Sequence, residues 1–422
     1  MILTSKLARM QFDSPVPDPL FGRPVQEALE NLPEGLDGLR TVLWLRQRLP
    51  PELARRAAQQ VELRQRARSR FPDGRLAYLT PQGLEQATPR AVAEFRAESI
   101  RRLAKGASVH DATCGLGSDA LALARAGFEL SCSDADPFTL ACARANLERL
   151  GLSATFRVAR AGEFEPAARI LLLDPDRRPR GLRTNDPERW SPPLSVAREL
   201  ALRHEGAVLK LPPAHEPDGD LCDAQPMIHR WISLRGQLAE VSLWTGILAG
   251  GAGDGSPRRE AIALDGRGGA ARLSGEPRSV EPLAARDAGR IRFLAEPDPA
   301  VIRAGLLGWL AAEVGLRPVA EAIAYLGGDQ PVDSPFLKSF RVLGSSTADR
   351  RQIQALLRRH DIGRVTVKKR GHPDPSAVLE RRWRGRGSRR GLLAVTRLAK
   401  GHLVYLLEPL ASPPSYPPSP GS

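Results

Sequence analysis

One stretch of the chain, residues 109–146, constrains the fold more than any other, because it joins two apolar runs through a glycine-rich turn. The apolar run 107–112 predicts a short strand that breaks at the turn Cys114-Gly115-Leu116-Gly117. A helix is expected next, and residues 128–132 predict a second strand that ends at Asp134. A strand, a helix and a second strand predict a parallel pair with a right-handed crossover. The glycines would let the main chain lie close to a ligand.

The acidic residues of this unit predict a pocket for a ribose-bearing ligand. Asp134 lies 19 positions after Gly115, near the offset of about 20 residues at which a carboxylate meets ribose hydroxyls in a nucleotide site. Two cofactor classes remain open on these residues. Gly115, Gly117 and Ala120 satisfy the dinucleotide fingerprint G-x-G-x-x-G/A. Asp111, at the end of the first strand, would instead repel a pyrophosphate and could hold an ammonium group.

The chain continues with the same alternation of apolar strands and helices. Apolar runs at 154–158, 170–173 and 207–211 predict three further strands, and helices are expected at 137–150 and 194–204. Alternating strands and helices predict an α/β fold with a doubly wound, Rossmann-like sheet.

A polar motif follows the run at 170–173 and reads Asp174-Pro175-Asp176-Arg177-Arg178. A carboxylate at a strand end can orient an acceptor group and remove a proton from it. Arg177 and Arg178 could clamp a phosphate, or they could form a surface salt-bridge cluster.

These motifs resemble those of class I S-adenosylmethionine-dependent methyltransferases, whose first motif has an acid followed by alternating glycines. Asp111 matches the acid, and Thr113 replaces the usual first glycine, as in RNA methyltransferases that resemble the trimethylguanosine synthases. The resemblance favours S-adenosylmethionine over a nicotinamide or flavin cofactor. It implies a cofactor site made of Asp111, Thr113, Cys114, Gly115, Gly117, Asp134, Ala135 and Phe138.

The resemblance also implies catalytic roles at the end of the fourth strand, for Asp174, Pro175, Asp176 and Arg177. Amino methyltransferases usually have Asp or Asn, two prolines and an aromatic residue here. This chain keeps the first two residues but has Asp176 and Arg177 in the last two places, which leaves the methylated atom open.

The sequence pattern changes in the C-terminal third of the chain. The Gly-rich, charged stretch 266–277 predicts a domain boundary near residue 280. The phrases EPDPAVIRAG, FRVLG and VKKRG resemble the THUMP-like domain at the C-terminus of a family of bacterial class I methyltransferases. That family's strand-four motif also looks like Asp-Pro-x-Arg-Arg, so the resemblance covers most of residues 75 to 408 and implies structured RNA as substrate. One helix is expected to carry a core-facing stripe of Val301, Ile302, Leu306, Trp309 and Leu310. The expected regions are an N-terminal helical region 1–105, a methyltransferase domain 106–279, a small α+β THUMP-like domain 280–410 and a disordered Pro/Ser-rich tail 411–422.

The charge of the chain favours a polyanionic partner. It has 62 basic and 48 acidic residues, a net charge of +14. The excess is local, because residues 364–400 hold twelve basic residues and only two acidic ones. The residues predicted to contact RNA are Lys368, Lys369, Arg370, Arg384, Arg386, Arg389 and Arg390. A solvated basic face is the alternative.

Other classes of protein fit less well. The four cysteines show no metal-ligand spacing, so no metal is expected. No apolar run approaches about 20 residues, and the first 15 residues lack a signal core, so a cytoplasmic protein without a membrane span is expected. A catalytically silent RNA-binding protein and an enzyme acting on a protein or small molecule remain as alternatives. The oligomeric state is left open.

Overall fold

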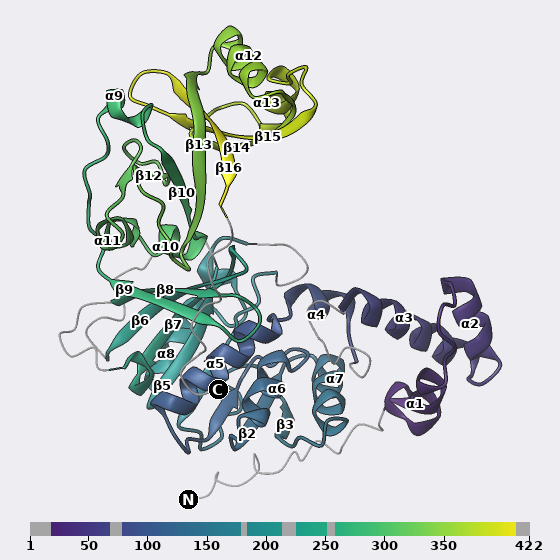
Figure 1. Ribbon diagram of the computed structural model, residues 1–422. Coiled ribbons are helices and arrows are strands. Elements are labelled where there is room, and N and C mark those ends of the chain that lie inside the picture. Colours follow the sequence, from purple (N-terminus) through teal and green to yellow (C-terminus); the bar gives the residue numbers. More distant parts are fainter. Residues whose placement is uncertain (1–17, 68–77, 179–183, 213–224, 251–257, 411–422) are drawn as a thin grey trace, which may run out of the picture. The chain divides into compact units, whose positions relative to one another are not determined.

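The computed structural model describes residues 18–67, 78–178, 184–212, 225–250 and 258–410 (Figure 1). The chain divides into two compact units. The first unit contains residues 1–101 and 106–168, and the second contains residues 102–105 and 169–422. The tail predicted at 411–422 lies outside the described residues.

The first unit is a set of helices followed by a β-α-β-α-β segment. Its elements are a 3₁₀ turn at Pro19–Phe21, α1 Arg23–Glu30, α2 Gly38–Arg46, α3 Pro51–Ala67, α4 Pro81–Gln86, α5 Arg90–Leu103, β1 Val109–Asp111, α6 Ser118–Arg125, β2 Leu130–Asp134, α7 Pro137–Glu148 and β3 Thr155–Val158.

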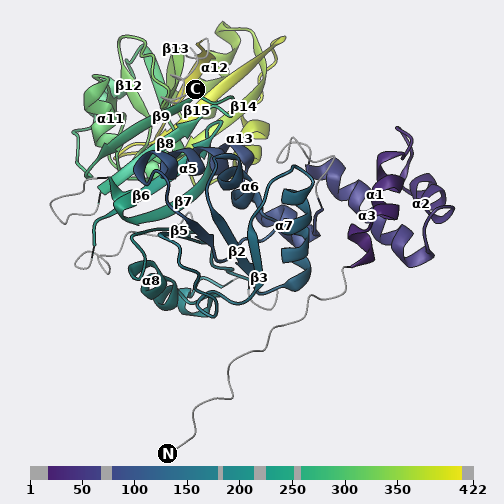
Figure 2. The same ribbon diagram turned by 90° about the horizontal axis from the view of Figure 1, so that it is seen from below.

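The three strands of the first unit are parallel and lie in the order β3-β2-β1. Figure 2 shows α6 and α7 beside β2 and β3, and both helices contact β2. Local sequence sets their ends. Gly127, with φ of +82°, follows α6, and the side chain of Asp136 accepts the first amide hydrogens of α7. The predicted β-α-β unit is therefore confirmed.

The N-terminal helices α1, α2 and α3, purple in Figure 1, share one core with the segment that follows them. Asp18 accepts two hydrogen bonds from Arg56 on α3, at 2.9 and 2.7 Å. These bonds from the guanidinium lower the pKa of Asp18 below its ordinary value. The pair fixes the start of the helical region to α3.

The second unit begins with a mixed sheet in the order β4-β5-β7-β6-β8-β9. Its elements are β4 Ile170–Leu173, a 3₁₀ turn at Pro187–Arg189, α8 Leu194–Leu202, β5 Gly206–Leu211, β6 Met227–Leu234, β7 Gln237–Gly246, a 3₁₀ turn at Ile247–Ala249, β8 Arg258–Leu264 and β9 Ala270–Gly275. β4 and β5 are parallel and buried along their whole length. β7 runs antiparallel to both of its neighbours, β5 and β6.

Short turns explain why the later strands of this sheet are not all parallel. Arg235 and Gly236 form the two-residue connection between β6 and β7, with φ of 53° and 73°, as a tight hairpin requires. The side chain of Asp265 accepts from the amides of Arg267 and Gly269 at 2.6 and 2.9 Å, which closes the β8-β9 hairpin. The stretch 266–277 therefore contains a strand, which its glycine content had hidden.

The second unit ends with another sheet, here named the C-terminal sheet, in the order β11-β12-β10-β13-β16-β15-β14. Its elements are α9 Ala285–Ala288, β10 Phe293–Pro297, α10 Pro299–Arg303, α11 Leu307–Glu313, β11 Arg317–Pro318, β12 Leu326–Gly328, β13 Leu337–Thr347, α12 Arg350–Arg359, β14 Ile362–Arg370, α13 Ser376–Arg382, β15 Arg389–Arg397 and β16 His402–Pro409. The helices α12 and α13 share one hydrophobic core with β14, β15 and β16 (Figure 1).

The prediction of a single helix carrying the stripe from Val301 to Leu310 is wrong. Two short helices, α10 and α11, replace it, and Gly305 between them has φ of +72°. Trp309 is 37% exposed instead of lying in a core stripe, because its indole donates to the carbonyl of Glu276 and stacks with Arg278. The α/β fold class itself is confirmed. None of the helices in the described ranges is long and apolar enough to cross a membrane.

Candidate active site

The glycine turn, residues 114–117, follows β1 and holds both of its glycines in left-handed conformations. The φ angle is +54° at Gly115 and +82° at Gly117. A Cβ added at Gly115 would meet no atom within 4 Å, whereas one at Gly117 would lie 3.2 Å from the Cβ of Ala143 on α7. Gly117 therefore permits packing on α7, and Gly115 leaves open space beside the backbone, as a closely bound ligand requires.

Asp134 is fixed in front of the glycine turn by two backbone amides. Its Oδ2 accepts from the amide of Gly115 at 2.9 Å, and its Oδ1 accepts from the amide of Asp136 at 2.9 Å. Each carboxylate oxygen has a second lone pair. The side chain can therefore accept further hydrogen bonds from a ligand without releasing the turn. Ala135, the next residue, is exposed.

The carboxylate of Asp111 is buried at the end of β1, with the residue only 2% exposed. Its Oδ1 is 3.4 Å from the amide nitrogen of Thr113. The thiol of Cys114 is buried, and a hydrogen bond with Cys132 together with this burial raises its pKa. Cys114 is therefore a neutral packing group. Three features fit S-adenosylmethionine. The buried carboxylate of Asp111 suits its ammonium group, and the fixed carboxylate of Asp134 suits its ribose hydroxyls. The open space at Gly115 suits a ligand that lies close to the backbone.

Phe138, one of the residues of the expected cofactor site, contacts the N-terminal helical region. Its ring centroid lies 5.9 Å from that of Phe21, and the guanidinium of Arg56 lies 5.5 Å from its centroid. The side chain is partly buried against the same core as Tyr78. Its role at the cofactor stays a prediction.

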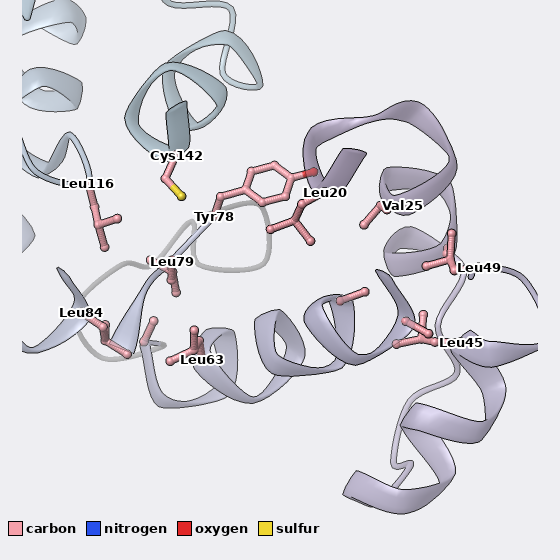
Figure 3. Packing of buried hydrophobic residues seen from close by; sticks show 14 residues of the cluster. Leu20, Val25, Leu45, Leu49, Leu63, Tyr78, Leu79, Leu84, Leu116 and Cys142 are labelled. Atoms are coloured by element: carbon pink, nitrogen blue, oxygen red, sulfur yellow. The ribbon is translucent and has the colours of Figure 1, made fainter. Parts of the chain in front are cut away.

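A buried asparagine, which the sequence reasoning missed, joins the glycine turn to the segment before it. Asn146 on α7 donates to the carbonyl oxygens of Tyr78 and Leu116 at 3.0 and 3.2 Å, and it accepts from the amide of Tyr78. Figure 3 shows Tyr78, Leu116 and Cys142 in this region. An asparagine among the buried positions of α7 was the sequence feature that could have indicated this contact.

The resemblance to class I methyltransferases implies a lid over the cofactor pocket at residues 78–86, with a plain connecting loop as the alternative. This segment contains the short helix α4. Gln60 on α3 holds its start through two hydrogen bonds with the backbone of Leu79, at 2.8 and 2.9 Å. A Cβ added at Gly83 would lie 2.6 Å from Cγ of Leu116 in the glycine turn. This segment is therefore packed directly on the glycine turn, and its role in closing a cofactor pocket stays a prediction.

Another buried network links the helices on either side of β1. Arg96 on α5, which is 1% exposed, pairs with Asp119 on α6, and Asp119 also accepts from the hydroxyl of Thr88 at 2.9 Å. These contacts direct the Asp119 side chain towards α5. The N-cap of α6 is Gly117, which makes no side-chain cap bond.

The second unit contains the polar motif that follows β4. The side chain of Asp174 is 45% exposed, and its Oδ2 accepts from Nζ of Lys210 at 2.9 Å. Asp176 exchanges two backbone hydrogen bonds with Ser191, at 2.8 and 3.0 Å. Its side chain accepts from the amide of Arg178 at 3.0 Å. These hydrogen bonds fix the turn that follows β4, and the carboxylate of Asp174 is exposed on it.

Lys210 on β5 is a residue that the sequence reasoning missed. It is 8% exposed and lies within a strand whose other residues are apolar, Gly206–Leu211. A lysine inside an otherwise apolar strand was the sequence feature that could have identified it. Pro175 is buried, and Arg177 is partly buried.

The basic residues predicted on β14 are partly occupied by other contacts. Lys368 and Arg370 both pair with Glu296, at 2.6 and 3.7 Å, and Arg370 lies over the ring of Tyr325. The ammonium group of Lys369, which is exposed, donates to a backbone carbonyl at 3.0 Å.

Four arginines in and after the loop that leads into β15 are exposed: Arg384 and Arg386 in the loop, and Arg389 and Arg390 at the start of β15. Glycines hold this loop close to β14. A Cβ at Gly385 would lie 2.1 Å from the carbonyl oxygen of Ile362, and one at Gly387 would lie 2.1 Å from the carbonyl carbon of Asp361. The loop can therefore follow the strand closely only with glycine at these places.

The helix α12 adds four arginines that the sequence reasoning missed: Arg350, Arg351, Arg358 and Arg359. All four are exposed. Gln354, between the two pairs, donates to the carbonyl of Arg384 at 2.9 Å and so joins the helix to the loop. We name the residues Arg350, Arg351, Arg358, Arg359, Arg384 and Arg386 the arginine surface. Among the described residues, none of its members forms an ion pair.

The described part of the chain contains no group of three or more His, Cys, Asp or Glu side chains that could hold a metal ion.

Comparison with known proteins agrees with this geometry. Two curated proteins, from two strains of Mycobacterium tuberculosis, are each named an uncharacterized S-adenosylmethionine-dependent methyltransferase. Each is 36% identical to this chain over 331 residues, which cover 78% of this chain and 86% of the relative. Residues 337–409 match the family model described as THUMP domain-like.

One solved structure has the same fold across both units. It is described as a putative methyltransferase from Porphyromonas gingivalis, and its TM-score is 0.72 at 19% sequence identity. The match covers 92% of this chain and 97% of that chain.

Proposed function

Because this chain belongs to a family of S-adenosylmethionine-dependent methyltransferases with a C-terminal THUMP-like domain, we propose that it methylates structured RNA, such as tRNA or rRNA. S-adenosylmethionine is its cofactor. The observation that carries the RNA proposal is the arginine surface, whose members have no acidic partner among the described residues.

The first unit binds the cofactor in this proposal. Asp111 takes the ammonium group, Asp134 takes the ribose hydroxyls, and the backbone at Gly115 leaves room for close approach. Thr113, Cys114, Gly117, Ala135 and Phe138 complete the proposed site. The support for these roles is the open space at Gly115 and the fixed orientation of Asp134.

The second unit orients the acceptor in this proposal. S-adenosylmethionine supplies a methyl group already activated on a sulfonium centre, so the protein needs mainly to position the acceptor and accept its proton. Asp174 is the carboxylate proposed for that role, because its side chain is 45% exposed and its Oδ2 is held by Lys210 at 2.9 Å. Pro175, Asp176 and Arg177 are proposed to shape the surrounding turn.

The arginine surface is suited to phosphate because guanidinium groups pair with phosphate oxygens in a bidentate way. Its residues lie on a helix and on a backbone-anchored loop, so they can follow a phosphate chain without reading base edges. Arg389 and Arg390 extend this surface in the proposal. Lys368 and Arg370 contribute less, because Glu296 neutralises part of their charge. Lys369 stays a proposed contact.

We also propose that the expected regions hold as functional parts: a helical region 1–105, a methyltransferase domain 106–279 and an RNA-binding part 280–410. The N-terminal helices then support the cofactor site through the core that they share with residues 78–84.

A labelling experiment tests the acceptor. The purified protein is incubated with methyl-labelled S-adenosylmethionine and separately with RNA, protein and small-molecule fractions from cells that lack its gene. Label is expected in tRNA or rRNA, and mass spectrometry of nucleosides from the deletion and complemented cells should identify the lost modification. Label confined to protein or small molecules would contradict the RNA proposal. Asp174→Ala serves as the catalytic control and should lower transfer by at least about 100-fold, the lower end for a positioned acid or base.

A further inference from the structure

Polar residues form a continuous row across the first sheet of the second unit. Lys210 on β5 pairs in register with Ser242 on β7, and Ser242 pairs with Arg230 on β6. Arg230 in turn pairs with Glu260 on β8. All four of these residues are buried. Polar side chains at the centre of buried strands are rare unless they are paired, so each member needs a partner.

The row ends at Asp174. Leu173, the last residue of β4, pairs with Leu209, so Asp174 comes opposite Lys210 in the parallel register. At the other end, Arg230 donates to Glu260 at 2.6 Å. The row therefore contains two ion pairs, and only the Lys210–Asp174 pair has a solvent-exposed carboxylate.

The two partners differ strongly in exposure. The side chain of Lys210 is 8% exposed, and that of Asp174 is 45% exposed. A buried ammonium group without a partner is unfavourable, so Lys210 is constrained to stay beside Asp174. Its ammonium group holds Oδ2 of Asp174 at 2.9 Å.

We propose that Lys210 is a positioning residue for the acceptor-binding carboxylate. It fixes the orientation of the Asp174 carboxylate towards the group that receives the methyl. This inference rests on the proposed function, because it assumes the role given there to Asp174.

The chain offers a matched control on the same two strands. Arg169 and Glu205 precede β4 and β5 directly, and they form an ion pair at 2.6 Å. Each member of this pair lies five positions before Asp174 or Lys210, which is about 17 Å along a strand. Glu205→Gln therefore breaks an ion pair at the start of β4 and β5, at the opposite end from the motif.

The first test measures methyl transfer to the labelled RNA fraction. Lys210→Met should lower kcat by about 10- to 100-fold, since small misplacement of a reacting group costs up to about 100-fold. KM for RNA and the affinity for S-adenosylmethionine should change less than about threefold, and Lys210→Arg should restore much of the rate. Glu205→Gln should transfer at the unmutated rate.

A double variant separates positioning from an independent effect. If Lys210 acts through Asp174, Lys210→Met should change kcat by less than about twofold in the Asp174→Asn background, because coupled residues are not additive. An equal loss in both backgrounds would overturn the proposal. So would a Lys210→Met enzyme as active as Glu205→Gln.

A second measurement needs no acceptor. In thermal unfolding, Asp174→Asn should lower Tm because it removes the negative charge that pairs with the buried Lys210, and adding Lys210→Met should recover part of that loss. Additive changes in Tm would overturn the pairing itself. A protein that shows this coupling but labels no RNA would instead refute the RNA proposal and leave the pair intact.

Discussion

At the scale of single residues, Gly115 and Gly117 share a left-handed backbone for different physical reasons. At Gly117 a side chain would press on Ala143, whereas at Gly115 it would enter open space. A sequence motif does not distinguish between the two glycines. Only the surroundings show that one serves packing and the other serves access of a ligand.

Gly115→Ala should therefore fold but bind S-adenosylmethionine more weakly. The left-handed backbone costs a non-glycine residue roughly 1 to 2 kcal/mol, and an added methyl group in a tight contact costs about 1 to 3 kcal/mol of binding. Isothermal calorimetry measures the second quantity. Gly106→Ala is the matched control, because Gly106 has φ of +71° and also has no atom near its Cβ position. Equal loss of affinity in both variants would place the ligand elsewhere.

Asp134→Ala should weaken S-adenosylmethionine binding by roughly 1.5 to 3 kcal/mol, the usual value for a lost hydrogen bond to a charged group. The same calorimetric titration measures it. Asp136→Ala is the control, because Asp136 caps α7 and its removal should cost about 1 kcal/mol of stability without affecting binding. Undiminished affinity in Asp134→Ala would exclude this carboxylate from the ribose site.

At the scale of elements, local patterns predicted the β-α-β unit and the strands β3, β4 and β5 correctly. Gly127 and Asp136 set helix ends through backbone geometry that neighbouring residues determine. The missed features depend on distant residues. β9 exists because it pairs with β8, and the helix expected to carry the stripe from Val301 to Leu310 breaks at Gly305.

The residues of the candidate site also separate into those that local sequence predicted and those that it did not. The sequence placed Gly115 and Asp134 together, and the structure joins them by a hydrogen bond of 2.9 Å. Lys210, Asn146 and Arg96 were missed because each contacts a residue at least 23 positions away, and no local pattern names that partner.

The helix α4 gives a test at this scale. Gly83→Ala should loosen the packing of α4 on the glycine turn, because its Cβ would lie 2.6 Å from Cγ of Leu116. We expect faster amide hydrogen exchange in residues 78–86 and weaker S-adenosylmethionine binding, since overpacking costs about 1 to 3 kcal/mol. Gly38→Ala is the control, because Gly38 on α2 has no atom near its Cβ position. Faster amide hydrogen exchange in residues 78–86 together with an unchanged affinity for S-adenosylmethionine would show that α4 does not support the cofactor site.

At the scale of the whole molecule, a net charge of +14 could attract RNA to any part of the surface. The structure separates basic residues that are neutralised from those that are not. Lys368 and Arg370 share Glu296, whereas Arg358 and Arg359 on α12 are exposed and form no ion pair within the described residues. Residues of equal charge are therefore expected to contribute unequally to RNA binding.

Salt dependence distinguishes a local phosphate contact from the overall charge. Each phosphate contact contributes roughly 0.7 to 0.9 to the slope of log K against log salt. Replacing Arg358 and Arg359 with glutamine should therefore flatten the slope by about 1.4 to 1.8. The matched pair Lys368→Gln with Arg370→Gln removes the same charge but should flatten it less, because Glu296 already holds both side chains.

A third double variant, Arg40→Gln with Arg46→Gln on α2, removes two exposed charges from the first unit and should leave the slope nearly unchanged. Fluorescence anisotropy with a tRNA transcript over a series of salt concentrations gives all three slopes. The affinity for S-adenosylmethionine should be the same in every variant, because none of these residues lies in the proposed cofactor site. Three equal slopes would mean that RNA responds to the net charge of the protein, and the arginine surface would then have no special part in binding.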